Sequence, residues 1–254
     1  MKIVIKVGTS TLAHATGRLN LKRTGELCKV ISDLKNAGHE LILVSSGAIG
    51  MGVGKLALLE KPTDIPTKQA AAAVGQCELM YTYDKLFAEY GHTVAQILLT
   101  GSDFTAKDRH ENFSNTIERL LTLHALPIIN ENDTVATEEI KVGDNDTLSA
   151  LVAVSVKADM LVILSDVDGL YSSDPHKDKN AKLIEEVRGV TDELFSLAGD
   201  TGSALGTGGM KTKLTAAKLC AKEGVDTVIA NGENPALLYD IVANEKKGYT
   251  RFYA

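Results

Sequence analysis

The chain begins with the stretch Met1-Lys2-Ile3-Val4-Ile5-Lys6-Val7-Gly8-Thr9-Ser10, and this stretch decides the fold. β-Branched residues at positions 3, 5 and 7 alternate with their neighbours up to Gly8, which is typical of a strand that ends in a glycine turn. Lys6 then lies at the carboxyl end of the strand, where open α/β sheets bind their ligands. Gly8 lets a ligand approach the backbone closely, and Thr9 and Ser10 add hydroxyl groups. On this stretch alone, a solvated surface lysine is the simpler interpretation of Lys6.

The composition is that of an ordinary globular protein with a net negative charge. The 254 residues are 44% hydrophobic and 24% charged, and the net charge is −6. This length allows one large α/β domain. No block of lysine and arginine interleaved with aromatic residues occurs, which argues against nucleic acid as a partner. A negatively charged protein that binds anions must build local positive sites, so single lysines in loops become candidates.

Cysteine usage and hydropathy both indicate a cytoplasmic protein. The three cysteines, Cys28, Cys77 and Cys220, are widely spaced and form no CxxC pair, so we expect reduced thiols. No apolar run approaches the ~18 residues that cross a bilayer, and no signal-peptide pattern precedes the first strand. We therefore expect a cytoplasmic location and no membrane partner.

Strand-like and helix-like segments alternate along nearly the whole chain. Apolar runs of strand length occur at residues 2–7, 40–45, 93–100, 126–130, 159–165, 181–190, 226–230 and 249–253. Helical spacing predicts helices over about 21–37, 67–90, 109–124, 147–157, 192–197, 210–224 and 235–243. The alternation predicts a mostly parallel sheet with helices on both faces. We expect one domain over residues 1–254, with a division into two lobes near residue 158.

Three glycine-rich turns are candidates for phosphate binding: Gly8, Gly47 to Gly54, and Gly206 to Gly209. Glycine at such a turn lets consecutive backbone N–H groups point at an anion. Each one alone is more simply an ordinary turn. Residues 50–56 are one residue too short for the P-loop pattern, and no complete GxGxxG follows a strand. The signatures of P-loop NTPases and Rossmann dehydrogenases are therefore missing.

The most informative window is Thr207-Gly208-Gly209-Met210-Lys211-Thr212-Lys213. A glycine pair precedes a helix whose first turn carries two lysines, although cations are unfavourable there because of the helix macrodipole. A bound anion such as a nucleotide phosphate would resolve this conflict, whereas two solvated lysines are the alternative. We favour the anion because the preceding loop, residues 199–209, is also rich in glycine.

Acidic and amide side chains gather in the loops before the helix at 147–157. Asp144-Asn145-Asp146 opens that helix, and Asn132 and Asp133 belong to the same loop system, which has a hairpin signal at 135–142. One capping residue satisfies a helix start, so the surplus groups suit recognition of an ammonium group, positioning of lysines, or indirectly held magnesium. The six histidines lack metal-ligand spacing, so we predict no zinc site.

Six ordered blocks of this sequence closely resemble the amino-acid kinase superfamily. The blocks are residues 6–10, 44–49, 130–133, 143–150, 164–171 and 206–213. Within that superfamily they resemble the glutamate 5-kinase family, and the resemblance covers nearly the whole chain. Six blocks in order are far more specific than any single glycine turn.

The resemblance implies a three-layer αβα sandwich with a mostly parallel central sheet. An N-terminal lobe, about residues 1–158, would hold glutamate, and a C-terminal lobe, about 159–254, would hold ATP. Lys6 and Lys213 would flank the transferring phosphoryl group, with Asp146 holding both lysines in place. The implied glutamate contacts are Ser46, Asp133 and Asn145. The implied ATP contacts are Lys6, Ser165, Asp166, Thr207, Gly208, Gly209, Met210, Lys211, Thr212 and Lys213.

The resemblance also implies an activity: ATP-dependent phosphorylation of the γ-carboxylate of L-glutamate, which is the first step of proline biosynthesis. Mg²⁺ would be carried by the nucleotide, with no metal site in the protein itself. A homo-oligomer and feedback inhibition by proline are further implied. Many members carry an additional C-terminal PUA domain, and because this sequence ends at Ala254 we expect the short form.

Two other functions stay open at this point. The first is another kinase of the superfamily, acting on aspartate, acetylglutamate, carbamate or a nucleoside monophosphate, although the blocks at 130–133 and 143–146 favour glutamate. The second is a non-catalytic amino-acid sensor on the same fold. Retention of Lys6, Asp146 and Lys213 together argues against a sensor, because a sensor needs no group that stabilises a transferring phosphoryl.

Overall fold

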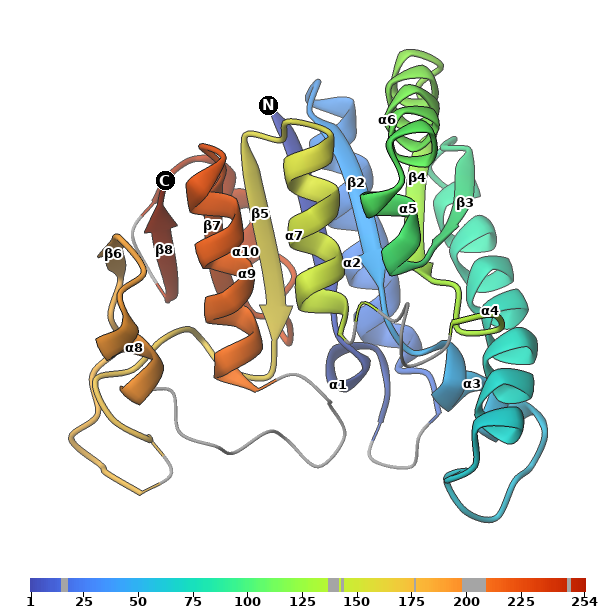
Figure 1. Cartoon of the computed structure of the whole chain (residues 1–254), viewed down its shortest axis with the longest axis horizontal. Helices are drawn as coiled ribbons and strands as arrows, with labels where there is room; N and C mark the ends of the chain where they lie inside the picture. The colour runs from blue at the N-terminus through green and yellow to red at the C-terminus, as the bar shows by residue number, and fades with distance from the viewer. Residues whose placement is uncertain (15–17, 137–141, 143, 176, 198–208, 246–247) are drawn as a thin grey trace.

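The computed structural model describes residues 1–14, 18–136, 142, 144–175, 177–197, 209–245 and 248–254 (Figure 1). Its strands are β1 (Lys2–Val7), β2 (Glu40–Ser45), β3 (Val94–Leu99), β4 (Leu126–Glu131), β5 (Met160–Ser165), β6 (Glu186–Arg188), β7 (Asp226–Asn231) and β8 (Tyr249–Tyr253). Its helices are α1 (Thr9–Leu12), α2 (Leu21–Asn36), α3 (Ala48–Lys55), α4 (Ile65–Ala88), α5 (Gly101–Thr105), α6 (Lys107–Thr122), α7 (Asn145–Ser155), α8 (Asp192–Leu197), α9 (Met210–Lys222) and α10 (Leu237–Val242).

The strands form one sheet in the order β3-β4-β2-β1-β5-β7-β8-β6. β1 lies inside the sheet and pairs in parallel with β2 on one side and β5 on the other. The β7–β8 pair is antiparallel, and the other pairs are parallel. The predicted mostly parallel sheet is therefore confirmed.

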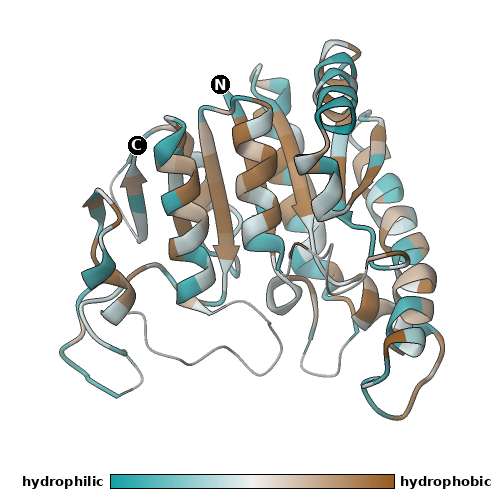
Figure 2. Cartoon of the chain, viewed as in Figure 1, coloured by the Kyte–Doolittle hydropathy of each residue, from teal (hydrophilic) through white to brown (hydrophobic). Residues whose placement is uncertain are grey.

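Two hydrophobic cores lie on opposite faces of the sheet, which makes the molecule a three-layer αβα sandwich. One core contains Val4 of β1 with residues of α6, α7 and α9. The other contains Ile3, Ile5 and Val7 with residues of α2, α4 and α10. Figure 1 shows α6, α7 and α9 in front of the sheet and α2 and α10 behind it, and Figure 2 shows β2 and β5 as nearly continuous hydrophobic strands. Burial on both faces explains the uninterrupted apolar runs.

The predicted glycine turn at residues 47–54 is wrong over most of its length, because residues 48–55 form helix α3. Its glycines permit close helix packing: a Cβ on Gly52 would lie 1.8 Å from the carbonyl oxygen of Ala71 in α4. A Cβ on Gly75 in α4 would likewise lie 1.7 Å from the carbonyl oxygen of Ala48. Gly47, with φ of +107°, makes the turn from β2 into α3.

Other expectations differ from the structure only locally. The strand expected at 181–190 is confined to β6, and the sequence pattern did not predict α5. Most of the hairpin at 135–142 and of the loop at 199–209 lies outside the described residues. Within the described ranges, no helix combines the length and the apolar composition needed to cross a membrane.

The close packing of α3 on α4 generates a stability prediction with a matched control on the same helix. Gly52→Ala should lower the free energy of unfolding by about 3 kcal/mol, because the new methyl group would overlap a backbone carbonyl. A Cβ at position 54 would have no other atom within 4 Å. Gly54→Ala should therefore raise the free energy of unfolding by about 0.5–1 kcal/mol, because alanine has the higher helix propensity. Urea unfolding of both variants measures the difference, and equal effects would show that the contact is not tight.

Candidate active site

A buried carboxylate joins two lysines that come from distant parts of the sequence. Asp146 Oδ1 lies 2.7 Å from Lys6 Nζ, and Asp146 Oδ2 lies 3.4 Å from Lys213 Nζ. Asp146 is 1% exposed, Lys6 is 8% exposed and Lys213 is 4% exposed. The solvated lysine that the first strand favours when taken alone is therefore wrong for Lys6. We call Lys6, Asp146 and Lys213 the ion triad.

The fold brings the ion triad together at the carboxyl end of the central strands. Lys6 is the penultimate residue of β1, Asp146 lies in the first turn of α7, and Lys213 lies in the first turn of α9. Figure 1 shows that β5 points toward the edge of the sheet from which α7 and α9 begin. Parallel sheets bind ligands at this edge.

The environment of Asp146 keeps it ionised. Burial alone would raise its pKa, but the charges of Lys6 and Lys213, together with hydrogen bonds from Lys6 and Thr212, hold the pKa below its ordinary value. Thr212 Oγ1 donates to Asp146 Oδ2 at 2.7 Å. Both carboxylate oxygens therefore bind protein cations or donors, and neither is left to act as a base.

One carboxylate against two ammonium groups leaves the ion triad with an excess positive charge. The sequence posed a conflict between Lys213 and the start of its helix, and Asp146 supplies a protein anion that resolves part of it. Two lysines at this edge of the sheet suit an anionic ligand. The N-caps of α1 and α9 are Gly8 and Gly209, which have no side chain to occupy the first N–H groups of those helices.

A chain of amide hydrogen bonds lies beside the ion triad. Asn145 Nδ2 donates to Ser46 Oγ at 2.7 Å and to Asn130 Oδ1 at 3.0 Å. Asp144 caps α7 by accepting from Thr147 N at 2.8 Å, so Asn145 and Asp146 are free of the capping function. The structure thus brings together Ser46 and Asn145, two of the three predicted glutamate contacts.

The structure shows fewer contacts for the other predicted substrate and nucleotide residues. Asp133 is half-buried in the turn that follows β4, and its contact with glutamate stays a prediction. Ser165, at the end of β5, donates to the exposed Asp166 at 3.0 Å. The other predicted nucleotide contacts are Gly209, Met210, Lys211 and Thr212 at the start of α9, and Thr207 and Gly208, which lie outside the described residues.

Sequence reasoning missed two buried amides, Gln76 and Asn130, which are 8% and 4% exposed. Asn130 Nδ2 donates to Gln76 Oε1 at 3.0 Å, which connects α4 to the end of β4. Asn130 belongs to a block that resembles the family, but the resemblance implied no role for it. Gln76 sits in an alanine-rich helix with no local pattern to mark it.

The donor set fits a nucleotide phosphate better than a bare metal ion. In the described part of the chain, no three His, Cys, Asp or Glu side chains are grouped so that they could hold a metal. The buried carboxylate of Asp146 is already occupied by Lys6, Lys213 and Thr212. Two ammonium groups and uncapped backbone N–H groups are instead suited to phosphate oxygens.

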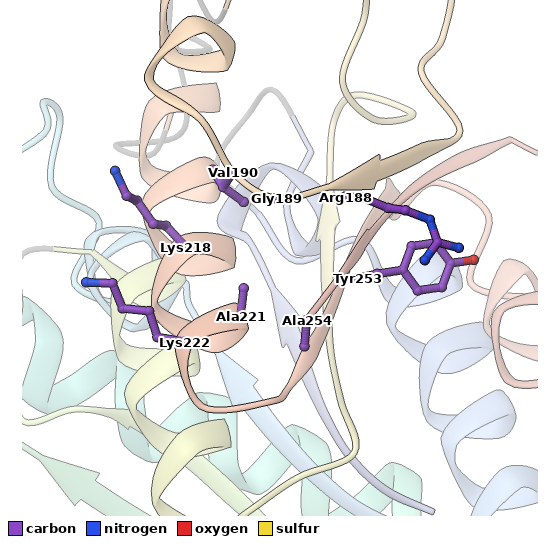
Figure 3. A pocket seen from close by; sticks show the side chains of 8 residues that line it. All are labelled: Arg188, Gly189, Val190, Lys218, Ala221, Lys222, Tyr253 and Ala254. Atoms are coloured by element: carbon purple, nitrogen blue, oxygen red, sulfur yellow. The ribbon is translucent and has the colours of Figure 1, made fainter.

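A separate hollow of about 480 Å³ lies at the far end of α9 from the ion triad (Figure 3). Its lining includes Arg188, Lys218, Lys222 and Tyr253. In Figure 3 the amino groups of Lys218 and Lys222 point away from Arg188 and Tyr253, so the cations do not converge on one ligand position. The ion triad therefore remains the candidate active site.

The low pKa of Asp146 generates a prediction of pH-dependent stability. Asp146→Asn should lower the free energy of unfolding by about 3 kcal/mol at pH 7, because two buried ammonium groups lose their counter-charge. Since the folded pKa lies below the unfolded value of about 3.9, the wild-type advantage should persist from pH 7 to about pH 4 and shrink at lower pH.

Urea unfolding from pH 7 to pH 3 measures this dependence. Asp144→Asn is the matched control, because asparagine caps a helix about as well as aspartate and the ion triad stays intact. A wild-type advantage over Asp146→Asn that does not change below pH 4 would contradict the assignment.

Comparisons with known proteins show which family the sequence matches. The model of the amino acid kinase family matches residues 1–231. The glutamate 5-kinase of Caldanaerobacter subterraneus subsp. tengcongensis is 55% identical over 98% of this chain and 67% of that protein. The glutamate 5-kinase of Clostridium acetobutylicum is 54% identical over 97% of this chain and 92% of its own length.

Two solved structures share the fold. Carbamate kinase from Giardia lamblia bound to AMP-PNP has a TM-score of 0.70 at 18% identity and covers 99% of this chain and 98% of its own. UMP kinase from Ureaplasma parvum has a TM-score of 0.67 at 16% identity, with coverage of 100% and 98%. The family model spans most of the sequence, and the two glutamate 5-kinases are more than half identical over nearly all of it. The chain therefore belongs to the amino acid kinase family, and within that family to the glutamate 5-kinases.

Proposed function

We propose that this chain transfers the γ-phosphoryl group of ATP to the γ-carboxylate of L-glutamate, which yields glutamyl 5-phosphate for proline biosynthesis. The observation that carries the proposal is the buried ion triad, which places two lysines, joined by one carboxylate, at the ligand-binding edge of the sheet. The relatives named glutamate 5-kinase support the acceptor, and an AMP-PNP-bound kinase of the same fold supports the donor.

The chemistry requires charge stabilisation and little else. A glutamate γ-carboxylate in water, with a pKa of about 4.3, is already ionised at neutral pH and needs no general base. One of its oxygens forms a bond to the γ-phosphorus while the bond from that phosphorus to the bridging oxygen breaks, and ADP leaves. The difficulty is to bring an anion up to a polyanion. Lys6 and Lys213 would offset this repulsion and stabilise charge on the transferring group.

Magnesium enters this proposal with the nucleotide. Mg²⁺ bound to the β- and γ-phosphates would neutralise part of their charge. Asp146 would serve a different purpose, because its carboxylate holds the two lysines at a fixed separation. Thr212 would add to that restraint through its hydrogen bond to the same carboxylate.

The two substrates would approach the ion triad from opposite sides. Ser46 follows β2 and Asn145 is the first residue of α7, and we assign them, with Asp133, to the glutamate side of the N-terminal lobe. Ser165 ends β5 and Asp166 follows it, and with the start of α9 we assign them to the nucleotide side of the C-terminal lobe.

The predicted homo-oligomer, proline inhibition and cytoplasmic location stay part of the proposal. Sedimentation equilibrium tests the first, since a purely monomeric protein would remove it. Turnover measured against added proline tests the second, and fractionation of cells tests the third.

One assay separates this function from the two alternatives. The protein is incubated with Mg-ATP and hydroxylamine together with each candidate acid, and any acyl phosphate is trapped as its hydroxamate. We expect a signal with glutamate alone. A signal with aspartate, acetylglutamate or another acid would select a different kinase of the family. No signal with any acid, combined with glutamate binding by calorimetry, would select the sensor.

Removal of either lysine of the ion triad should abolish most of the turnover. Lys6→Ala and Lys213→Ala should each lower kcat by about 10²–10⁴-fold, because a positioned cation stabilises the transferring phosphoryl. Circular dichroism checks that the fold survives. Lys2→Ala is the matched control, because Lys2 lies on the same strand as Lys6 but pairs with Glu118 at the opposite end. Near-normal kcat in either triad variant would remove that lysine from the mechanism.

Asp133 generates a prediction about the two Michaelis constants. Asp133→Ala should raise the KM for glutamate by about tenfold or more while the KM for ATP changes little, because a carboxylate would pair with the substrate ammonium. Steady-state kinetics with each substrate varied in turn measure both values. An equal increase in the two constants would remove Asp133 from the glutamate site.

A further inference from the structure

Two buried amides next to the glutamate side have no part in the phosphoryl chemistry. Gln76 on α4 and Asn130 on β4 are almost fully buried, and burial of a polar side chain is costly unless its hydrogen bonds are made. Gly75 holds this part of α4 tightly against the start of α3, just after Ser46 in the chain. Gln76 is therefore placed by backbone packing.

The hydrogen bonds are all donated in one direction, from Asn145 to Asn130 and from Asn130 to Gln76. Gln76 Oε1 accepts from Asn130 Nδ2 at 3.0 Å, so the Nδ2 end of the Asn130 amide faces α4. Asn130 Oδ1 then accepts from the backbone N–H of Glu131 at 2.9 Å and from Asn145 Nδ2 at 3.0 Å. If the Asn130 amide were reversed, its Nδ2 would face two other donors, the backbone N–H of Glu131 and Asn145 Nδ2.

This direction decides which atoms Asn145 and Ser46 can offer to a ligand. Asn145 Nδ2 is engaged by Asn130 and by Ser46 Oγ, and among the described residues no hydrogen bond reaches Asn145 Oδ1. Ser46 Oγ accepts from Asn145, so its own proton remains available to donate. The pair thus offers one acceptor and one donor.

We infer that Gln76 and Asn130 are positioning residues: Asn130 orients Asn145 and Gln76 holds Asn130 in place, so that Asn145 Oδ1 accepts from the α-ammonium of glutamate and Ser46 donates to a carboxylate. The inference rests on the proposed function, because it assigns the substrate groups to the protein atoms. Gln76 acts through Asn130 and Asn145 and does not itself touch substrate.

The test compares glutamate with glutarate, which keeps both carboxylates and lacks the ammonium group. The readout is the ratio of kcat/KM for the two acids in the hydroxamate assay, with the KM for ATP measured alongside. Gln76→Met has nearly the same volume and removes the acceptor, so the buried Nδ2 of Asn130 loses its partner and the Asn130 amide shifts from its position against Asn145. We expect the glutamate preference to fall by about tenfold or more, with the KM for ATP unchanged.

Rescue and control variants separate positioning from a structural effect. Gln76→Glu keeps an oxygen acceptor for Asn130 Nδ2 and should retain most of the preference. Gln96→Met makes the same substitution at an exposed position on β3 and should behave as the wild type. If Gln76→Met does not fold, Gln76→Ala removes the same acceptor by shortening the side chain.

Each outcome decides a different claim. An unchanged glutamate preference in folded Gln76→Met or Gln76→Ala would overturn the positioning assignment and leave the proposed function standing. A fall in preference that Gln76→Glu shares fully would also overturn it, since the acceptor oxygen would then be irrelevant. A wild type that forms no hydroxamate with glutamate would overturn the proposed function and this inference with it.

Discussion

A single buried carboxylate with two lysines is the interaction on which the candidate site depends. Burial of Asp146 is costly on its own, and it is tolerated because Lys6 and Lys213 approach it from different strands and helices. The same contacts hold the lysines close together despite their mutual repulsion. The surplus charge that results is a property of the assembled fold and is absent from any one segment.

The architecture explains why these three side chains meet. β1 lies in the interior of the sheet with cores on both faces, so that Lys6 emerges at the edge where α7 and α9 begin. A different constraint operates next to Ser46, where α3 and α4 approach each other closely at Gly52 and Gly75. On the same helix, Gln76 accepts a hydrogen bond from Asn130 at the end of β4.

Much of the fold could be predicted from the sequence because hydrophobic periodicity reports burial directly. The helix in the glycine-rich segment after β2 could not be predicted, because glycine occurs both in turns and at close helix contacts. The residue that it contacts, Ala71, is also distant in sequence. Spacing alone likewise gave no reason for Lys6, Asp146 and Lys213 to meet, and that expectation came from the family resemblance. Gln76 stayed hidden because a buried amide in an alanine-rich helix leaves no periodic signal.

The most direct test of the central claim is a crystal structure of the protein with ADP, aluminium fluoride, Mg²⁺ and glutamate, which mimics the transferring phosphoryl group. The account predicts that Lys6 Nζ and Lys213 Nζ both lie within about 3 Å of the fluoride atoms while each keeps its contact with Asp146. A complex in which the aluminium fluoride lies beyond hydrogen-bond distance of both lysines would contradict it.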